Sequence, residues 1–230
     1  MAGQVSRSAV VACDPAMCRL LRAHRVTHLD ELLPTTATPV HSEVIVATAA
    51  VRRQFGSRLS GVYAPTVIAS FGSGATRADI RVTAPHGPAA YRSDLAADLA
   101  ARTAAGAELL SNPRLKVSAG GRKQLEAGRV DPRLMIVLAV AAAEQKVTVL
   151  AFGDAGPGAG PAVPLRAAEL VGAPGTNRST FTQPMVSLLQ AQSAPYLPAR
   201  IQVRQLHGQT GVYLEYTAPS PLGLLGSSNS

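Results

Sequence analysis

Short apolar runs alternating with helical patterns are the feature that most constrains the fold of this chain. The run EVIVATAAV at 43–51 contains the continuous apolar core typical of a strand buried on both faces. Asp14 and Asp131 are each followed by proline, and this pair of residues starts helices. Segments 199–206 and 212–218 alternate apolar and polar residues and predict a C-terminal antiparallel hairpin. Together these patterns predict an α/β fold with a mixed, mostly parallel sheet and helices on both faces.

Prolines divide the chain near 85–88, within the sequence APHGP. This division predicts an N-terminal α/β subdomain at 1–84 and a C-terminal α/β subdomain at 85–218. Residues 219–230, PLGLLG among them, show no periodicity. They are expected to form a flexible tail.

The composition limits the kind of core and the kind of surface that the chain can build. Of its 230 residues, 47% are apolar but only 4% are aromatic, and none is tryptophan. The core must therefore consist of alanine, valine and leucine, which suits helices packed closely on a sheet better than a carbohydrate platform or a base-stacking surface. The longest apolar run, LMIVLAVAAA at 134–143, is too short to span a membrane and predicts a buried helix.

The chain is basic, and its positive charge comes almost entirely from arginine. The net charge is +8, with lysine only at positions 116, 123 and 146. Such an excess attracts polyanions. The arginines are nevertheless dispersed, without the Lys/Arg block that marks nucleic-acid surfaces, so nucleic acid is not the expected partner. The candidate polyanion-binding residues are Arg52, Arg53 and Arg58, on a helix expected to end near Gly61.

The loop GDAGPGAG at 153–160 follows a predicted strand and raises the question of phosphate binding. A phosphate loop needs free backbone N–H groups and a helix that starts at once. Here Pro157 and Pro161 lack the N–H, and the glycine spacing matches no dinucleotide or Walker motif. The sequence predicts a wide surface loop, although the end of a strand is where an α/β ligand site would lie. Asp154 is the only ionisable residue of the loop.

Cys13 and Cys18 are the two cysteines of the chain. Their spacing is neither a redox C-x-x-C pair nor half of a complete zinc site. With a helix beginning at Pro15, the two thiols lie within reach of one another. A structural disulfide, two free buried thiols and a reactive pair all remain open at this point. A disulfide would imply an oxidising compartment.

No motif for catalysis, metal or cofactor is complete. Ser73 lies in FGSGA, where phenylalanine occupies the place of the first glycine of G-x-S-x-G. The five histidines form no metal-binding pattern, so no metal and no cofactor is expected. If the protein is an enzyme after all, the strand-end loops at 72–76 and 153–160, with Ser73 and Asp154, are the alternative site.

Residues 109–152 contain NPRL, AGRVDPRL and a helix followed directly by a strand. This segment resembles the one that precedes the zinc site in D-alanyl-D-alanine carboxypeptidases of the VanY type. In that family the next segment carries a histidine, a second histidine and an aspartate, but here the following segment GDAGPGAGPAVPLRAAEL has no histidine. The resemblance therefore implies a related scaffold without the metal, and no catalytic residue can be carried over.

The opening VVACDPAMC and the closing APSPLGLLG are similar to segments of actinobacterial, membrane-tethered extracytoplasmic proteins of unknown function. The N-terminus lacks the apolar region of a secretory signal, so the tether is expected to lie outside this sequence; otherwise the protein is cytoplasmic. We expect a non-enzymatic extracytoplasmic module that binds a protein partner or an anionic cell-envelope polymer. The alternative is a cell-envelope hydrolase or transferase.

Overall fold

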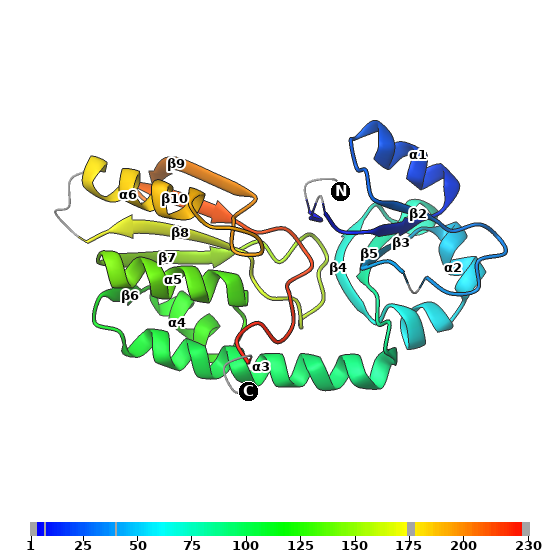
Figure 1. The fold of residues 1–230 in the computed structure, drawn as a ribbon, viewed down its shortest axis with the longest axis horizontal. Helices are drawn as coiled ribbons and strands as arrows, with labels where there is room; N and C mark the ends of the chain where they lie inside the picture. Colours follow the sequence, from blue (N-terminus) through cyan, green and yellow to red (C-terminus); the bar gives the residue numbers. More distant parts are fainter. Residues whose placement is uncertain (1–3, 7, 40, 174–177, 227–230) are drawn as a thin grey trace. The chain divides into compact units, whose positions relative to one another are not determined.

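The structure is a computed structural model that describes residues 4–6, 8–39, 41–173 and 178–226 (Figure 1). The chain forms two compact units, Met1–Leu95 with Ala155–Val163, and Ala96–Asp154 with Pro164–Ser230. Each unit has its own five-stranded sheet. The subdomain bounds given above, 1–84 and 85–218, remain predictions. No helix in the described part of the chain is both long enough and apolar enough to cross a membrane.

The first sheet has the strand order β2-β1-β3-β5-β4. Its strands are β1 (Val11–Cys13), β2 (Leu29–Glu31), β3 (Val44–Ala47), β4 (Thr66–Phe71) and β5 (Ala78–Val82). Strands β2 and β3 run parallel to β1, whereas β5 runs antiparallel to both β3 and β4. Strands β4 and β5 therefore form a hairpin, with GSGATR at its turn.

Helices cover both faces of the first sheet because its central strands β1 and β3 are buried apolar runs. The helices are α1 (Pro15–Ala23) and α2 (Ala49–Phe55), followed by the short helical turns η1 (Leu59–Tyr63) and η2 (Gly74–Thr76). Helix α1 packs with Val11 and Val46 on one face, while α2 packs with Ala12 and Ile45 on the other. The helix expected to end near Gly61 ends sooner, since Gly56 adopts a φ of +56° directly after α2.

The second sheet has the order β6-β7-β8-β10-β9, and only β6 and β7 are parallel. Its strands are β6 (Leu115–Val117), β7 (Val147–Gly153), β8 (Ala167–Gly172), β9 (Arg200–Leu206) and β10 (Gln209–Glu215). The helices of this part of the chain are α3 (Gly87–Ser111), α4 (Ala119–Glu126), α5 (Pro132–Glu144) and α6 (Arg178–Gln190). Helices α4, α5 and α6 share one buried apolar core with β7, β8 and β10 (Figure 1).

The α/β class and the C-terminal hairpin are confirmed, but the prediction of one mostly parallel sheet is wrong. Both sheets are mixed: parallel and antiparallel pairings are equal in number in the first sheet, and antiparallel pairings predominate in the second, so antiparallel pairings are the majority overall. The reason is the way the strands are joined. A parallel pair needs a long crossover, whereas β4 and β5, and likewise β9 and β10, follow one another through short turns that allow only antiparallel pairing. Helices cover both faces of the first sheet, but in the second sheet one face carries polar side chains.

Part of the expected flexible tail, 219–230, packs against the second unit. The backbone N–H of Gly223 donates to the Asp98 carboxylate at 3.2 Å, and Leu225 lies beside α3 and α5. The tail contacts these helices because Leu225 packs against the apolar core of this unit. Residues 227–230 of the predicted tail lie outside the described residues.

The close approach of α3 and α4 depends on Gly106. A Cβ added there would meet the backbone oxygen of Leu125, which no rotamer change can move. Gly106→Ala is therefore expected to lower the free energy of unfolding by about 1–3 kcal/mol, measured by urea denaturation. Gly120→Ala, in α4, is the matched control. That glycine faces open space, and alanine favours helix, so a gain of about 0.5–1 kcal/mol is expected. Equal effects at the two positions would contradict the packing argument.

Candidate functional site

Three arginine side chains surround one buried aspartate at an edge of the first sheet. The Asp79 carboxylate accepts hydrogen bonds from Arg77 Nε at 2.8 Å and from the Ser70 hydroxyl at 2.7 Å. The guanidinium nitrogens of Arg52 and Arg81 lie 3.7 and 4.0 Å from the other carboxylate oxygen. We call Arg52, Arg77, Arg81 and Asp79 the arginine cluster. It holds two more positive than negative charges.

The strands and the hairpin turn bring these residues together. Asp79 on β5 lies opposite Ala47 of β3 and Ser70 of β4. Helix α2 begins directly after β3, with Thr48 as its N-cap, so Arg52 lies one turn into the helix and donates back to the Ala47 carbonyl at 2.6 Å. The cluster thus lies where β3, a parallel strand, ends. This is the edge at which α/β sheets bind ligands.

Asp79 and Arg77 favour each other's charged states. Burial opposes ionisation of Asp79, but hydrogen bonds from Arg77 and Ser70 outweigh it, and the pKa of Asp79 lies below its ordinary value. The same hydrogen bond raises the pKa of Arg77. Arg77 remains 52% exposed, and its two terminal nitrogens donate to no atom of the described residues. The outer side of this guanidinium is therefore available to an anion.

The three arginines predicted to bind a polyanion do not form one cluster. Arg52 belongs to the arginine cluster and Arg53 is exposed on α2. Arg58 turns instead to Tyr63, with its guanidinium 4.9 Å from the ring centroid. Sequence reasoning missed Arg77 and Arg81. Their signal is the pattern R-x-D-x-R in a strand, because alternate strand residues point to one face.

Ser73 lies in the turn between β4 and β5 and is exposed. Its carbonyl accepts from the Thr76 N–H and hydroxyl, which closes the turn. The described residues give its own hydroxyl no hydrogen-bond partner. A serine nucleophile is activated by a base beside it; the alternative role of Ser73 stays a prediction.

The glycine loop pairs with protein backbone. The carbonyl of Pro157 accepts from the Ser70 N–H at 2.6 Å, and the Gly160 N–H donates to the Val67 carbonyl at 3.0 Å. Gly158 approaches Ser70 closely at a φ of +63°, a conformation and a distance that suit glycine. The loop is a connector that packs along β4, and the Gly160 N–H, a donor that a phosphate could use, donates to the protein backbone instead.

Asp154 lies in the other compact unit, at the end of β7, where it belongs to a second polar group. Burial raises the pKa of Glu215 on β10, and a hydrogen bond with Asp154 raises it further. The Tyr213 hydroxyl donates to Glu215 at 3.0 Å, and an Arg200 nitrogen lies 3.3 Å from the same carboxylate oxygen. Burial and Glu215 raise the pKa of Tyr213 to about 12. Sequence reasoning missed this group, except for Asp154.

The pair of Asp154 and Glu215 predicts a pH-dependent stability. Folding raises the pKa of Glu215. The stabilisation that the protonated carboxyl gives is therefore fully present below the pKa of Glu215 in the unfolded state, and it is lost as the pH rises through the pKa of Glu215 in the folded state. Glu215→Gln cannot ionise. We therefore expect the free energy of unfolding of Glu215→Gln, measured in urea relative to that of the parent protein, to increase from about pH 4 to about pH 8. Glu126→Gln, on an exposed part of α4, should give a difference that does not change with pH.

Cys13 and Cys18 are joined by a disulfide between the end of β1 and the first turn of α1. Both residues are buried. Asp14 between them caps α1, accepting from the N–H groups of Ala16 and Met17. The disulfide is therefore part of the helix start and is not placed as an exposed, reactive pair.

Within the described ranges, no three His, Cys, Asp or Glu side chains are grouped so that they could hold a metal ion. Comparison of the chain with models of protein families, with curated proteins and with solved structures finds no match.

Proposed function

We propose that this protein is a non-enzymatic module that binds an anionic cell-envelope polymer through the arginine cluster. One observation carries the proposal: three guanidinium groups face a single carboxylate, and two of them, on Arg52 and Arg77, remain partly exposed. Asp79 fixes the guanidinium groups in place without neutralising them. Binding of an anionic group there costs little side-chain entropy on the protein, because the guanidinium groups are already ordered.

Arginine suits this role better than lysine. Its planar fork donates two parallel hydrogen bonds to a phosphate or carboxylate. The net charge of +8 adds a long-range attraction for a polyanion. Both features support a polymer with repeated anionic groups. A protein partner with an acidic surface would meet the same cluster and is the outcome to consider if no polymer binds.

The proposed location is extracytoplasmic. The Cys13–Cys18 disulfide supports it, since disulfides persist in oxidising compartments. A membrane tether outside this sequence, an actinobacterial origin and a scaffold related to VanY-type carboxypeptidases remain proposals that rest on the sequence resemblance.

The direct experiment is co-sedimentation of the protein with isolated bacterial wall sacculi at low and at high salt, with the supernatant assayed for released fragments. Binding that falls with added salt, without fragments, is expected. Absence of binding at both salt concentrations would contradict the proposal and would direct attention to a protein partner.

A cell-envelope hydrolase or transferase is the second candidate. The observation that favours it is the group of Asp154, Glu215 and Tyr213, because a carboxyl group whose pKa is raised by burial and by a second carboxyl is a candidate general acid. The loop at 153–160 contributes Asp154 to this group, while a role for Ser73 in the loop at 72–76 stays a prediction. Release of fragments in the sedimentation experiment, abolished by Glu215→Gln, would favour this candidate.

A further inference from the structure

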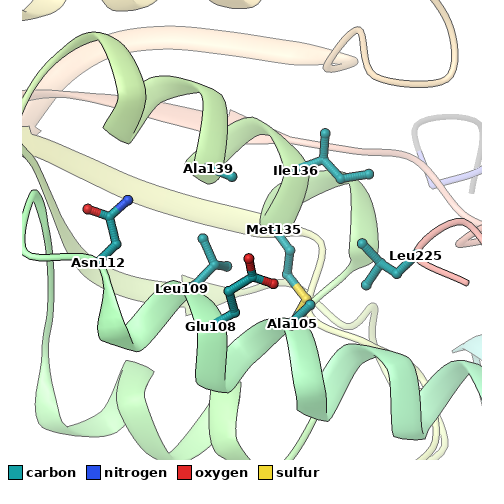
Figure 2. A pocket seen from close by; sticks show the side chains of 8 residues that line it. All are labelled: Ala105, Glu108, Leu109, Asn112, Met135, Ile136, Ala139 and Leu225. Carbon is teal, nitrogen blue, oxygen red and sulfur yellow. The ribbon is translucent and has the colours of Figure 1, made fainter. Parts of the chain in front are cut away.

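A pocket of about 200 Å³ opens between α3 and α5 in the second unit. Asn112, from the end of α3, lies at one end of the pocket, and Leu225, from the C-terminal segment, lies at the other (Figure 2). Between them the wall is mainly apolar and includes Leu109 and Ile136. The pocket is separate from the arginine cluster and from the group around Glu215.

Glu108 is the one ionisable residue that lines this pocket. Figure 2 shows its carboxylate rising from α3 toward α5, beside Leu109 and Met135. Glu108 is exposed, and its carboxylate forms no ion pair or hydrogen bond with the described residues. The chain as a whole carries a net charge of +8, whereas the Glu108 carboxylate makes this pocket negative.

Asn112 adds a second polar group at the same side. Its Oδ1 accepts from the Arg114 N–H at 2.9 Å, which leaves the amide nitrogen as the group that faces the pocket. The pocket therefore offers an apolar wall, a carboxylate and an amide. An apolar ligand with a cationic head complements this set, because the tail removes apolar surface from water while the head pairs with Glu108.

We propose that the pocket between α3 and α5 binds a small alkylammonium compound. The volume corresponds to about seven water molecules at ~30 Å³ each, so a ligand of about seven non-hydrogen atoms fills it. A primary amine on a short alkyl chain has this size and places its charge at the rim, where Glu108 lies. The inference is independent of the proposed polymer binding.

The test is an NMR titration of the full chain at neutral pH with hexylamine, hexanol and hexanoate. Hexylamine is expected to bind and to shift the backbone resonances of Ala105, Ile136 and Ala139. Hexanol should bind at least about ten-fold more weakly, because it lacks the charge. Hexanoate should not bind, since its carboxylate would face Glu108.

Two variants separate the pocket from surface binding. Glu108→Gln should weaken hexylamine binding about ten-fold, whereas Glu144→Gln, which removes an equally exposed carboxylate at the end of α5, should leave it unchanged. Ala139→Leu should fill the pocket and abolish binding; Ala139 is exposed, so the variant should fold. The proposal is overturned if hexylamine does not bind, if Glu108→Gln binds as well as the parent protein, or if hexanoate binds equally.

Discussion

Asp131→Ala is expected to lower the free energy of unfolding by about 3–5 kcal/mol. Asp131 is fully buried and caps α5 through the N–H of Arg133. It also pairs with the Arg133 guanidinium, accepting from Nε at 2.9 Å and from Nη2 at 2.8 Å. The Ser220 hydroxyl donates to the same carboxylate. Removing Asp131 thus takes away a helix cap and leaves a buried positive charge without its counter-ion.

The remaining contacts of Arg133 are too weak to compensate. It is 6% exposed, donates to the Thr217 carbonyl at 2.9 Å and lies over the Tyr216 ring at 4.7 Å. Urea denaturation of the parent protein, Asp131→Ala and Asp131→Asn measures the effect. Asp131→Asn keeps the cap and should lose less. Asp94→Ala, at an exposed position on α3, should change stability by less than about 0.5 kcal/mol. A loss below about 1 kcal/mol for Asp131→Ala would contradict the role of the pair.

The double variant Arg52→Gln/Arg77→Gln is expected to lose at least about ten-fold in affinity for an anionic polymer. The two charged guanidinium groups are replaced by shorter neutral amides, while Ser70 and Arg81 still contact Asp79. Arg19→Gln/Arg122→Gln removes the same net charge from exposed positions on α1 and α4 and is the matched control. A binding isotherm for each protein measures the difference. Equal losses would show that total charge, and not the arginine cluster, determines binding.

Local signals in the sequence predicted several elements correctly. Asp14 and Asp131 start α1 and α5 because the cap and the following proline act within one helical turn. The fully buried β3 follows from its unbroken apolar run. The sheet order could not be predicted in this way, because the choice of pairing partner depends on residues far apart in the chain.

The same distinction applies to the candidate site. Arg52 was found by its charge alone, but its contact with Asp79 needs β3 and β5 to pair in one register. Asp154 meets Glu215 only because β8 lies between β7 and β10. The sequence did contain a usable signal for Arg77 and Arg81, namely their alternation with Asp79. Recognising it required treating this segment as a strand with one polar face.

The most direct test of the account is a titration of the protein with polyglycerol phosphate, followed calorimetrically at about 50 mM and about 200 mM salt. Two arginine–phosphate contacts predict binding that weakens about ten-fold between these concentrations, with no release of fragments from the polymer. Absence of binding at the lower concentration, or an affinity that does not change with salt, would contradict the claim that the arginine cluster holds an anionic polymer.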